Sequence, residues 1–95
     1  MTTRSVTVRN RLGMHARAAA RFVHLATRFD SQIHVRRDSK VMDGKSIMGI
    51  LLLSAAQGTA IEITADGGDE VAAIDALCQL VESGFGEEAA ESWNA

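Results

Sequence analysis

The chain has 95 residues, of which 46% are hydrophobic, and this size and composition suit one globular domain with a single core. Its unbroken apolar runs, such as 50–53, are far shorter than the roughly 20 residues of a membrane span, and residues 1–8 lack the layout of a secretory signal. A single cysteine, Cys78, excludes an internal disulfide and has no metal-ligand spacing around it. These features predict a cytoplasmic protein that holds no metal and makes no contact with a membrane.

Charge is divided unevenly along the chain, although the formal net charge is only −2. All ten Lys and Arg lie in residues 1–45, together with three Asp, whereas residues 46–95 contain nine acidic residues and no Lys or Arg. Two interpretations follow from this asymmetry. Either the basic half is available to an acidic partner or to phosphate, or the two halves pair with each other across the fold.

A strand and a helix are the first elements predicted. Residues 4–9 alternate polar and apolar side chains, which is typical of a half-buried strand with Val6 and Val8 inside. After a turn-like break over residues 10–13, residues 16–29 change to helical periodicity. The inward stripe of this helix is predicted to be Ala19, Phe22, Val23 and Ala26. Another face carries Arg17, Arg21, His24 and Arg28.

Two short strands and a short helix are predicted in the middle of the chain. Residues 33–35 mark one strand and residues 40–43 the other, joined by a turn over 37–39. Ser46 is suited to begin a helix over residues 47–53, because its hydroxyl accepts a hydrogen bond from an otherwise unpaired backbone N–H. This segment therefore predicts a hairpin followed by a capped helix.

A fourth strand and a longer helix complete the predicted domain, which spans residues 1–86. Residues 59–65 alternate with both isoleucines facing inward, and a glycine-containing turn leads into a helix that ends near Gly84. The inward stripe of this helix is predicted to be Val71, Ile74, Leu77, Cys78 and Val81. Residues 87–95 are expected to form an acidic, frayed tail. The order β-α-β-β-α-β-α predicts an α+β fold, one sheet with its helices on a single face.

The strongest candidate for chemistry is the segment 13–17, Gly-Met-His-Ala-Arg, where the first strand ends and the first helix begins. Unpaired N–H groups and a partial positive charge at a helix start favour a phosphate. His15 can present a ring nitrogen there as a nucleophile. A phosphorylated imidazole would gain hydrogen bonds from the N–H groups of Ala16 and Arg17, and the Arg17 guanidinium would add a charge-assisted contact. The alternative is an ordinary exposed histidine at a helix cap.

Two segments of the chain resemble the signatures of one known family. Residues 10–23, NRLGMHARAAARFV, are similar to the active-site segment of HPr proteins, and residues 43–50, DGKSIMGI, resemble their second signature around a regulatory serine. The lengths between the motifs match, and the likeness runs from about residue 6 to residue 84. One departure is Ala18, which stands where the family usually has proline. Alanine maintains the helix, so the departure concerns the rigidity of the active-site turn rather than the nucleophile.

The resemblance implies a bacterial phosphocarrier with an open-faced sandwich fold, a four-stranded antiparallel sheet covered on one face by three helices. It implies that His15 is phosphorylated, that Arg17 stabilises the phosphoryl group and that Ser46 is the regulatory serine. The partners implied are enzyme I as donor, an enzyme IIA-type acceptor and an HPr kinase/phosphorylase acting on Ser46. We expect a monomeric, stoichiometric carrier that is not itself an enzyme and needs no cofactor.

A docking surface is also implied by the resemblance. Its residues would be Ala20, His24, Ile47, Met48 and Leu51. A seven-residue segment as apolar as 47–53 is unsuited to burying every side chain, and an adaptable methionine suits a surface that serves several partners. We expect Ile50 and Leu52 to occupy the core, and His24 and His34 to be surface histidines without a catalytic role.

Two other classes of function compete with the carrier interpretation. A purely regulatory module of the same fold would be modified on Ser46, but the presence of both His15 and Arg17 argues against an exclusively regulatory role. An RNA-binding domain would stack bases on strand aromatics. The aromatic residues here are Phe22, Phe29, Phe85 and Trp93. None of them lies on a predicted strand, so we expect no nucleic-acid partner. Within the family, residues 10–17 and 83–85 look like the nitrogen-related branch, whereas the GKSI setting of Ser46 looks like the sugar-related branch.

Overall fold

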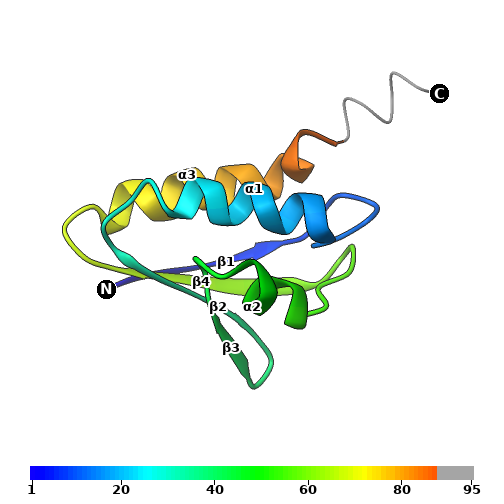
Figure 1. Cartoon of the computed structure of the whole chain (residues 1–95), viewed down its shortest axis with the longest axis horizontal. Coiled ribbons are helices and arrows are strands. Elements are labelled where there is room, and N and C mark those ends of the chain that lie inside the picture. The colour runs from blue at the N-terminus through cyan, green and yellow to red at the C-terminus, as the bar shows by residue number, and fades with distance from the viewer. Residues whose placement is uncertain (88–95) are drawn as a thin grey trace.

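A computed structural model describes residues 1–87 as a four-stranded sheet with helices packed on one face (Figure 1). The elements are β1 (Thr2–Thr7), α1 (Ala16–Ala26), β2 (Gln32–Arg37), β3 (Lys40–Asp43), α2 (Ile47–Leu52), β4 (Ala60–Asp66), α3 (Glu70–Glu82) and a 3₁₀ turn, η1 (Gly84–Gly86). The strand order is β1-β4-β2-β3, and every neighbouring pair is antiparallel. The predicted α+β order and the four-stranded antiparallel sheet with three α-helices are confirmed.

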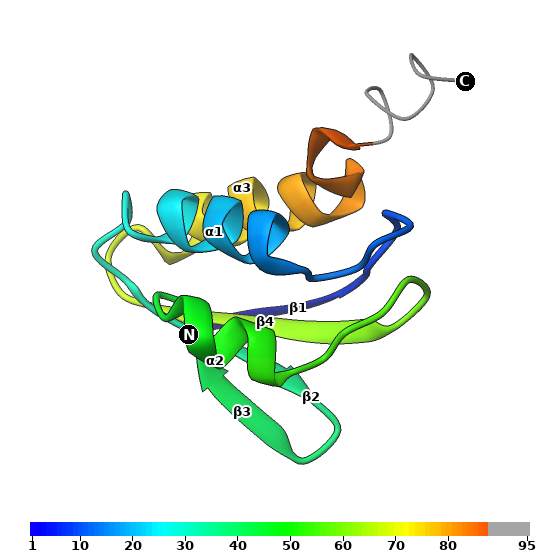
Figure 2. The same cartoon turned by 45° about the vertical axis from the view of Figure 1, so that its right-hand side comes forward.

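The core lies between the sheet and the helices, because each central strand turns alternate residues toward the helical layer. Ile33 and Val35 of β2 and Ile61 and Ile63 of β4 are buried, as predicted, and so is Phe22 of α1. Figure 2 shows α1 and α3 on the same side of the sheet, and α2 contacts both α1 and β3. Within residues 1–87 no helix combines the length and the hydropathy needed to cross a membrane.

Two predicted core residues lie at the surface instead. Leu52 is 54% exposed, and Leu53 is buried in its place, because Ile50 and Leu53 are three residues apart and share one face of this helical segment. Val71 is 61% exposed. At about 100° per residue, it lies roughly 90° around α3 from the centre of the buried stripe, which begins at Ala73. Cys78 is buried in that stripe as predicted, and burial raises the pKa of its thiol.

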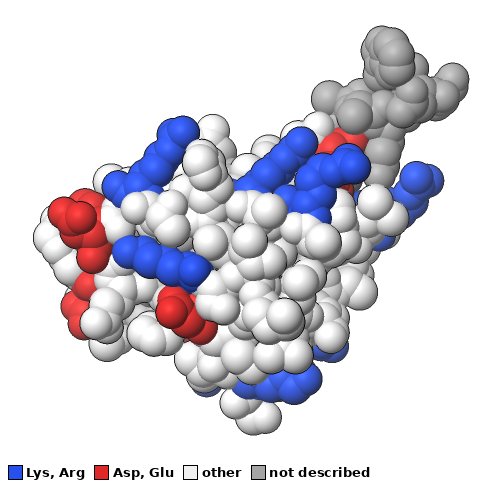
Figure 3. Space-filling model, viewed as in Figure 1, with Lys and Arg blue, Asp and Glu red and all other residues white. Residues whose placement is uncertain are grey.

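The structure bears out in part the interpretation that the two halves pair with each other. Arg4 pairs with Asp75 at 2.9 Å, and Arg36 pairs with Glu62 at 2.9 Å, so some basic residues of the first half do bind acidic residues of the second. Other Lys and Arg side chains remain spread over the side of the molecule that carries α1, with uncharged surface between them (Figure 3). The fold therefore keeps a basic surface beside the first helix.

Candidate functional site

A tight turn places His15 at the start of α1. The Asn10 side-chain Nδ2 donates to the Gly13 carbonyl at 2.7 Å, and the Gly13 N–H donates to the Asn10 carbonyl at 3.0 Å. Gly13 has φ +66°, and a Cβ there would lie 2.5 Å from the Ala55 carbonyl oxygen, so only glycine fits. The Met14 N–H then donates to the same Ala55 carbonyl, and the Met14 side chain is buried. The residue before the histidine is thus anchored on both its backbone and its side chain.

His15 is the N-cap residue of α1. Its Nδ1 accepts a hydrogen bond from the Arg17 N–H at 3.3 Å, and its carbonyl accepts from the Ala19 N–H at 2.8 Å. The ring is part-buried, with 26% of the side chain exposed. Nδ1 therefore lies where the first-turn N–H groups and the positive end of the helix dipole meet. The Arg17 side chain, two residues further along the chain, is exposed.

Glu87 belongs to this site, although we expected it to begin the frayed tail. Its Oε2 lies 2.5 Å from His15 Nε2, and its Oε1 accepts from Asn10 Nδ2 at 2.8 Å. The carboxylate is only 8% exposed. Residues 88–95 of the predicted tail lie outside the described residues.

The turn η1 brings Glu87 back to the site from the end of α3. Gly84, Phe85 and Gly86 all have positive φ, and the Phe85 ring is buried. The Arg21 guanidinium donates to the Phe85 carbonyl, which ties this turn to α1. A sequence signal for the turn does exist, because an aromatic residue between two glycines just after a helix indicates an anchored left-handed turn. It does not indicate which residue the chain then meets.

The predicted docking residues lie on α1 and α2. A groove along α1 is lined by Arg17, Ala20 and His24 of this helix, and also by Ile47 of α2 and Leu80 of α3. Ile47 is 45% exposed and Met48 is 67% exposed, while Leu51 is half-buried. We call Ala20, His24, Ile47, Met48 and Leu51 the docking patch. His24 and His34 are both at the surface, as expected.

Ser46 begins α2 as predicted. Its Oγ accepts a hydrogen bond from the Gly49 N–H at 3.1 Å, so the side chain has a structural role as the helix cap. Ser46 is half-buried and directly precedes the docking-patch residues Ile47 and Met48.

The chain is similar in sequence to the members of a known protein family. Residues 2–83 match the family model described as "PTS HPr component phosphorylation site". The chain is 44% identical over 87 residues to the phosphocarrier protein HPr of Neisseria meningitidis serogroup A, covering 92% of this chain and 98% of the relative. It is also 44% identical to the HPr of Treponema pallidum, covering 93% of this chain and all of that protein.

Solved structures agree with the sequence comparison. The crystal structure of HPr-C-His from Thermoanaerobacter tengcongensis has a TM-score of 0.87 and 46% identity, covering 90% of this chain and 97% of that chain. The phosphocarrier protein HPr from Bacillus anthracis has a TM-score of 0.82 and 40% identity, covering 84% and 95%. A structure described as an HPr dimer from Thermoanaerobacter tengcongensis is also similar, with a TM-score of 0.72, 46% identity and coverage of 90% and 98%. Our expectation of a monomer stays a prediction.

The fold and the matched phosphorylation-site motif define a class of protein, the phosphocarriers of the phosphotransferase system. The chain belongs to the HPr family. Membership of this family, predicted from the two sequence segments, is therefore confirmed by similarity over nearly the whole chain.

Proposed function

We propose that His15 takes a phosphoryl group from phosphorylated enzyme I and passes it to an enzyme IIA-type acceptor. The observation that carries this proposal is the orientation of the ring at the start of α1. Nε2 faces the buried Glu87 carboxylate, whereas Nδ1 lies on the opposite edge of the ring, against the first-turn N–H groups. A phosphoryl group on Nδ1 would meet the positive end of the helix dipole.

The chemistry assigned to the site is nucleophilic transfer in both directions. The Nδ1 lone pair attacks phosphorus, a new N–P bond forms, and the bond between phosphorus and the donor group of enzyme I breaks. The N–H groups of Ala16 and Arg17 would receive the phosphoryl oxygens, and the exposed Arg17 guanidinium would bind them through charge-assisted hydrogen bonds. Transfer to the acceptor is the reverse of these bond changes.

We infer that this chain is a stoichiometric carrier rather than an enzyme, acts as a monomer in the cytoplasm and needs no cofactor. Its small site binds only the transferred group, and the energy comes from the phosphoryl donor. We expect neither a nucleic acid nor a membrane among its partners. The donor and the acceptor would both dock on the docking patch, where Ile47 and Met48 offer exposed apolar surface next to the basic side of α1.

We also propose that Ser46 is the target of an HPr kinase/phosphorylase where such an enzyme is present. A phosphate on Ser46 would be stabilised by the start of α2 but would add about two negative charges next to the docking patch. It would therefore weaken docking to an acidic partner.

The carrier function is tested by incubation with phosphoenolpyruvate and a cognate enzyme I, followed by intact-mass measurement. The wild-type protein should gain about 80 Da, the mass of one phosphoryl group. His15→Ala should gain nothing, whereas the matched control His34→Ala, on the exposed face of β2, should be phosphorylated like the wild type. Phosphorylation of His15→Ala would overturn the proposal.

A further inference from the structure

We propose that Glu87 is a positioning residue that holds the Nε2–H of His15 through the whole phosphoryl cycle. It would thereby make Nδ1 the nucleophile and stabilise the positive charge that the ring acquires when Nδ1 is phosphorylated. This inference rests on the proposed function of His15 and extends it to a residue 72 positions away in the sequence.

The protonation of the ring follows from the two hydrogen bonds that His15 makes. Nδ1 accepts from the Arg17 N–H at 3.3 Å and so carries no proton in this state. A neutral imidazole has one proton, which must then be on Nε2. Nε2 lies 2.5 Å from Glu87 Oε2, so its proton is donated to this carboxylate. The contacts on opposite edges of the ring therefore select the same tautomer.

The Glu87 carboxylate is held in place by groups other than the histidine. Asn10 is fully buried, and its Nδ2 donates both to Glu87 Oε1 at 2.8 Å and to the Gly13 carbonyl at 2.7 Å. The Asn10 Oδ1 is buried with no hydrogen-bond partner in the described part of the chain. An unsatisfied buried oxygen costs free energy of folding. The Asn10 amide is nevertheless held in the orientation in which Nδ2 donates to both Glu87 and Gly13. On the other side, the buried Phe85 anchors η1 just before Glu87.

The charge of the His15 ring changes during the transfer step. When Nδ1 attacks phosphorus, its lone pair becomes the N–P bond and the donor leaves with the electrons of the bond that breaks. Nε2 keeps its proton, so the ring changes from neutral to positively charged. The Glu87 carboxylate is 8% exposed and directly faces that charge, where it interacts more strongly than it would in water. When the phosphoryl group leaves, the N–P electrons return to Nδ1 and the ring is neutral again.

Glu87→Gln tests this role because it keeps the size of the side chain and an oxygen that accepts from Nε2–H, but removes the charge. Initial rates of phosphoryl transfer from phosphorylated enzyme I should be about tenfold lower than in the wild type, since a hydrogen bond to a charged group is roughly twice as strong as a neutral one. Glu87→Asp retains the charge and should keep more of the rate than Glu87→Gln. The matched control is Glu82→Gln, the same change at an exposed position of α3, which should behave like the wild type.

Nitrogen-15 NMR of the unphosphorylated protein supplies a second readout. The wild type and Glu82→Gln should show the Nε2–H tautomer of His15 with its ring proton far downfield, and this proton signal should move upfield in Glu87→Gln. The proposal would be overturned if Glu87→Gln transferred phosphoryl groups at the same rate as the wild type. It would also be overturned if the spectrum of the wild-type protein showed the His15 ring proton on Nδ1. If the wild type itself accepts no phosphoryl group on His15, the proposed function fails instead, and the spectrum alone still tests whether Glu87 holds Nε2–H.

Discussion

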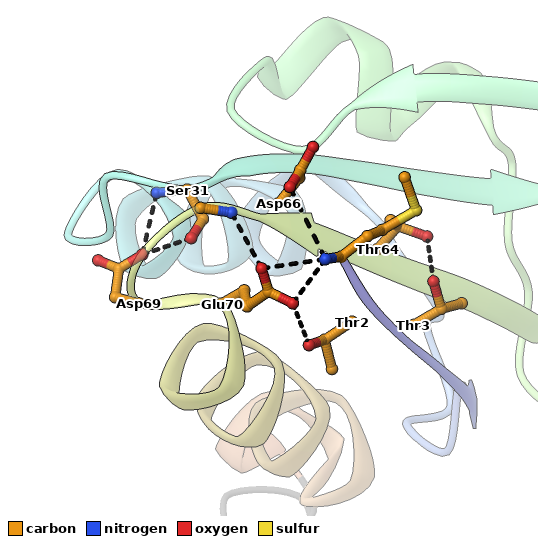
Figure 4. A network of polar contacts seen from close by, with 9 residues as sticks. Thr2, Thr3, Ser31, Thr64, Asp66, Asp69 and Glu70 are labelled. Atoms are coloured by element: carbon orange, nitrogen blue, oxygen red, sulfur yellow. Dashed lines mark hydrogen bonds and ion pairs between the residues drawn. The ribbon is translucent and has the colours of Figure 1, made fainter.

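Helix α3 has a carboxylate network at each end, and the two networks differ in the groups that the carboxylates bind. At the start of α3, Glu70 accepts from the Met1 ammonium group, from the Thr2 hydroxyl at 2.5 Å and from the Gly67 N–H at 3.3 Å (Figure 4). Beyond the other end, Glu87 accepts from Asn10 and faces the ring of His15. Figure 1 shows the two ends of α3 far apart on the molecule.

At the start of α3, the donors to the two carboxylates are backbone N–H groups, hydroxyl groups and the N-terminal ammonium group. Asp69 accepts from the N–H groups of Asp30 and Ser31 and from the Ser31 hydroxyl, which ties the turn before β2 to the turn before α3. The hydrogen bond from Ser31 is the main cause that lowers the pKa of Asp69. At the other end, the histidine ring has a second nitrogen that is only weakly engaged. Of the two networks, the one at Glu87 is the one in which a donor, the ring of His15, has a further reactive atom.

Arg17→Ala should have the largest effect of these substitutions, and the effect should be on phosphoryl transfer rather than on stability. Loss of the guanidinium removes a charge-assisted contact to the phosphoryl oxygens, which should slow transfer from enzyme I about 10- to 100-fold. The thermal unfolding midpoint should stay the same, because the Arg17 side chain is exposed. Arg36→Ala, on the exposed face of β2, is the matched control and should transfer at the wild-type rate. Equal transfer rates in the two variants would contradict the assignment of Arg17.

Ser46 provides a second contrast, because its hydroxyl is used by the cap of α2. Ser46→Ala should lower the free energy of unfolding by about 1 kcal/mol in denaturant titrations and leave phosphoryl transfer unchanged. Ser46→Asp keeps an acceptor at the cap but adds a negative charge beside the docking patch, so it should slow transfer. Equal rates for Ser46→Asp and the wild type with every partner would end the regulatory proposal.

Glu70→Gln should have the smallest effect, and only on stability. Hydrogen bonds from the N-terminal ammonium group and from Thr2 lower the pKa of Glu70 from 4.5 to about 2. A carboxylate with a lowered pKa stabilises the folded state above its unfolded pKa and loses this contribution as the pH falls toward the folded value. The difference in thermal midpoint between wild type and variant should therefore begin to narrow below about pH 4.5 and close near pH 2. A constant difference across this range, or slower phosphoryl transfer in the variant, would contradict a structural role for Glu70.

Local patterns in the sequence predicted most of the fold and half of the site. Strand alternation placed Ile61 and Ile63 inside, while helical periodicity from residue 16 and the cap signal at Ser46 located the starts of two helices, because each depends only on neighbours along the chain. Leu52 was assigned wrongly because six residues of a uniformly apolar helix do not define which face is buried.

Glu87 could not be predicted as part of the site because its contact with His15 joins segments 72 residues apart. No periodicity connects the end of α3 to the turn before α1, and an acidic residue after a Gly-Phe-Gly turn is just as compatible with a solvated tail. The contact depends on the way α1 and α3 pack side by side, which is a property of the tertiary fold.

The most direct test of the account is to identify the phosphorylated nitrogen by phosphorus-31 and nitrogen-15 NMR of the phosphorylated protein. We predict one phosphoryl group, bonded to Nδ1 of His15, with the ring proton on Nε2. A phosphoryl group on Nε2, or on His24 or His34, would contradict the account, because the nitrogen that faces Glu87 would then be the reactive one or His15 would not be the carrier.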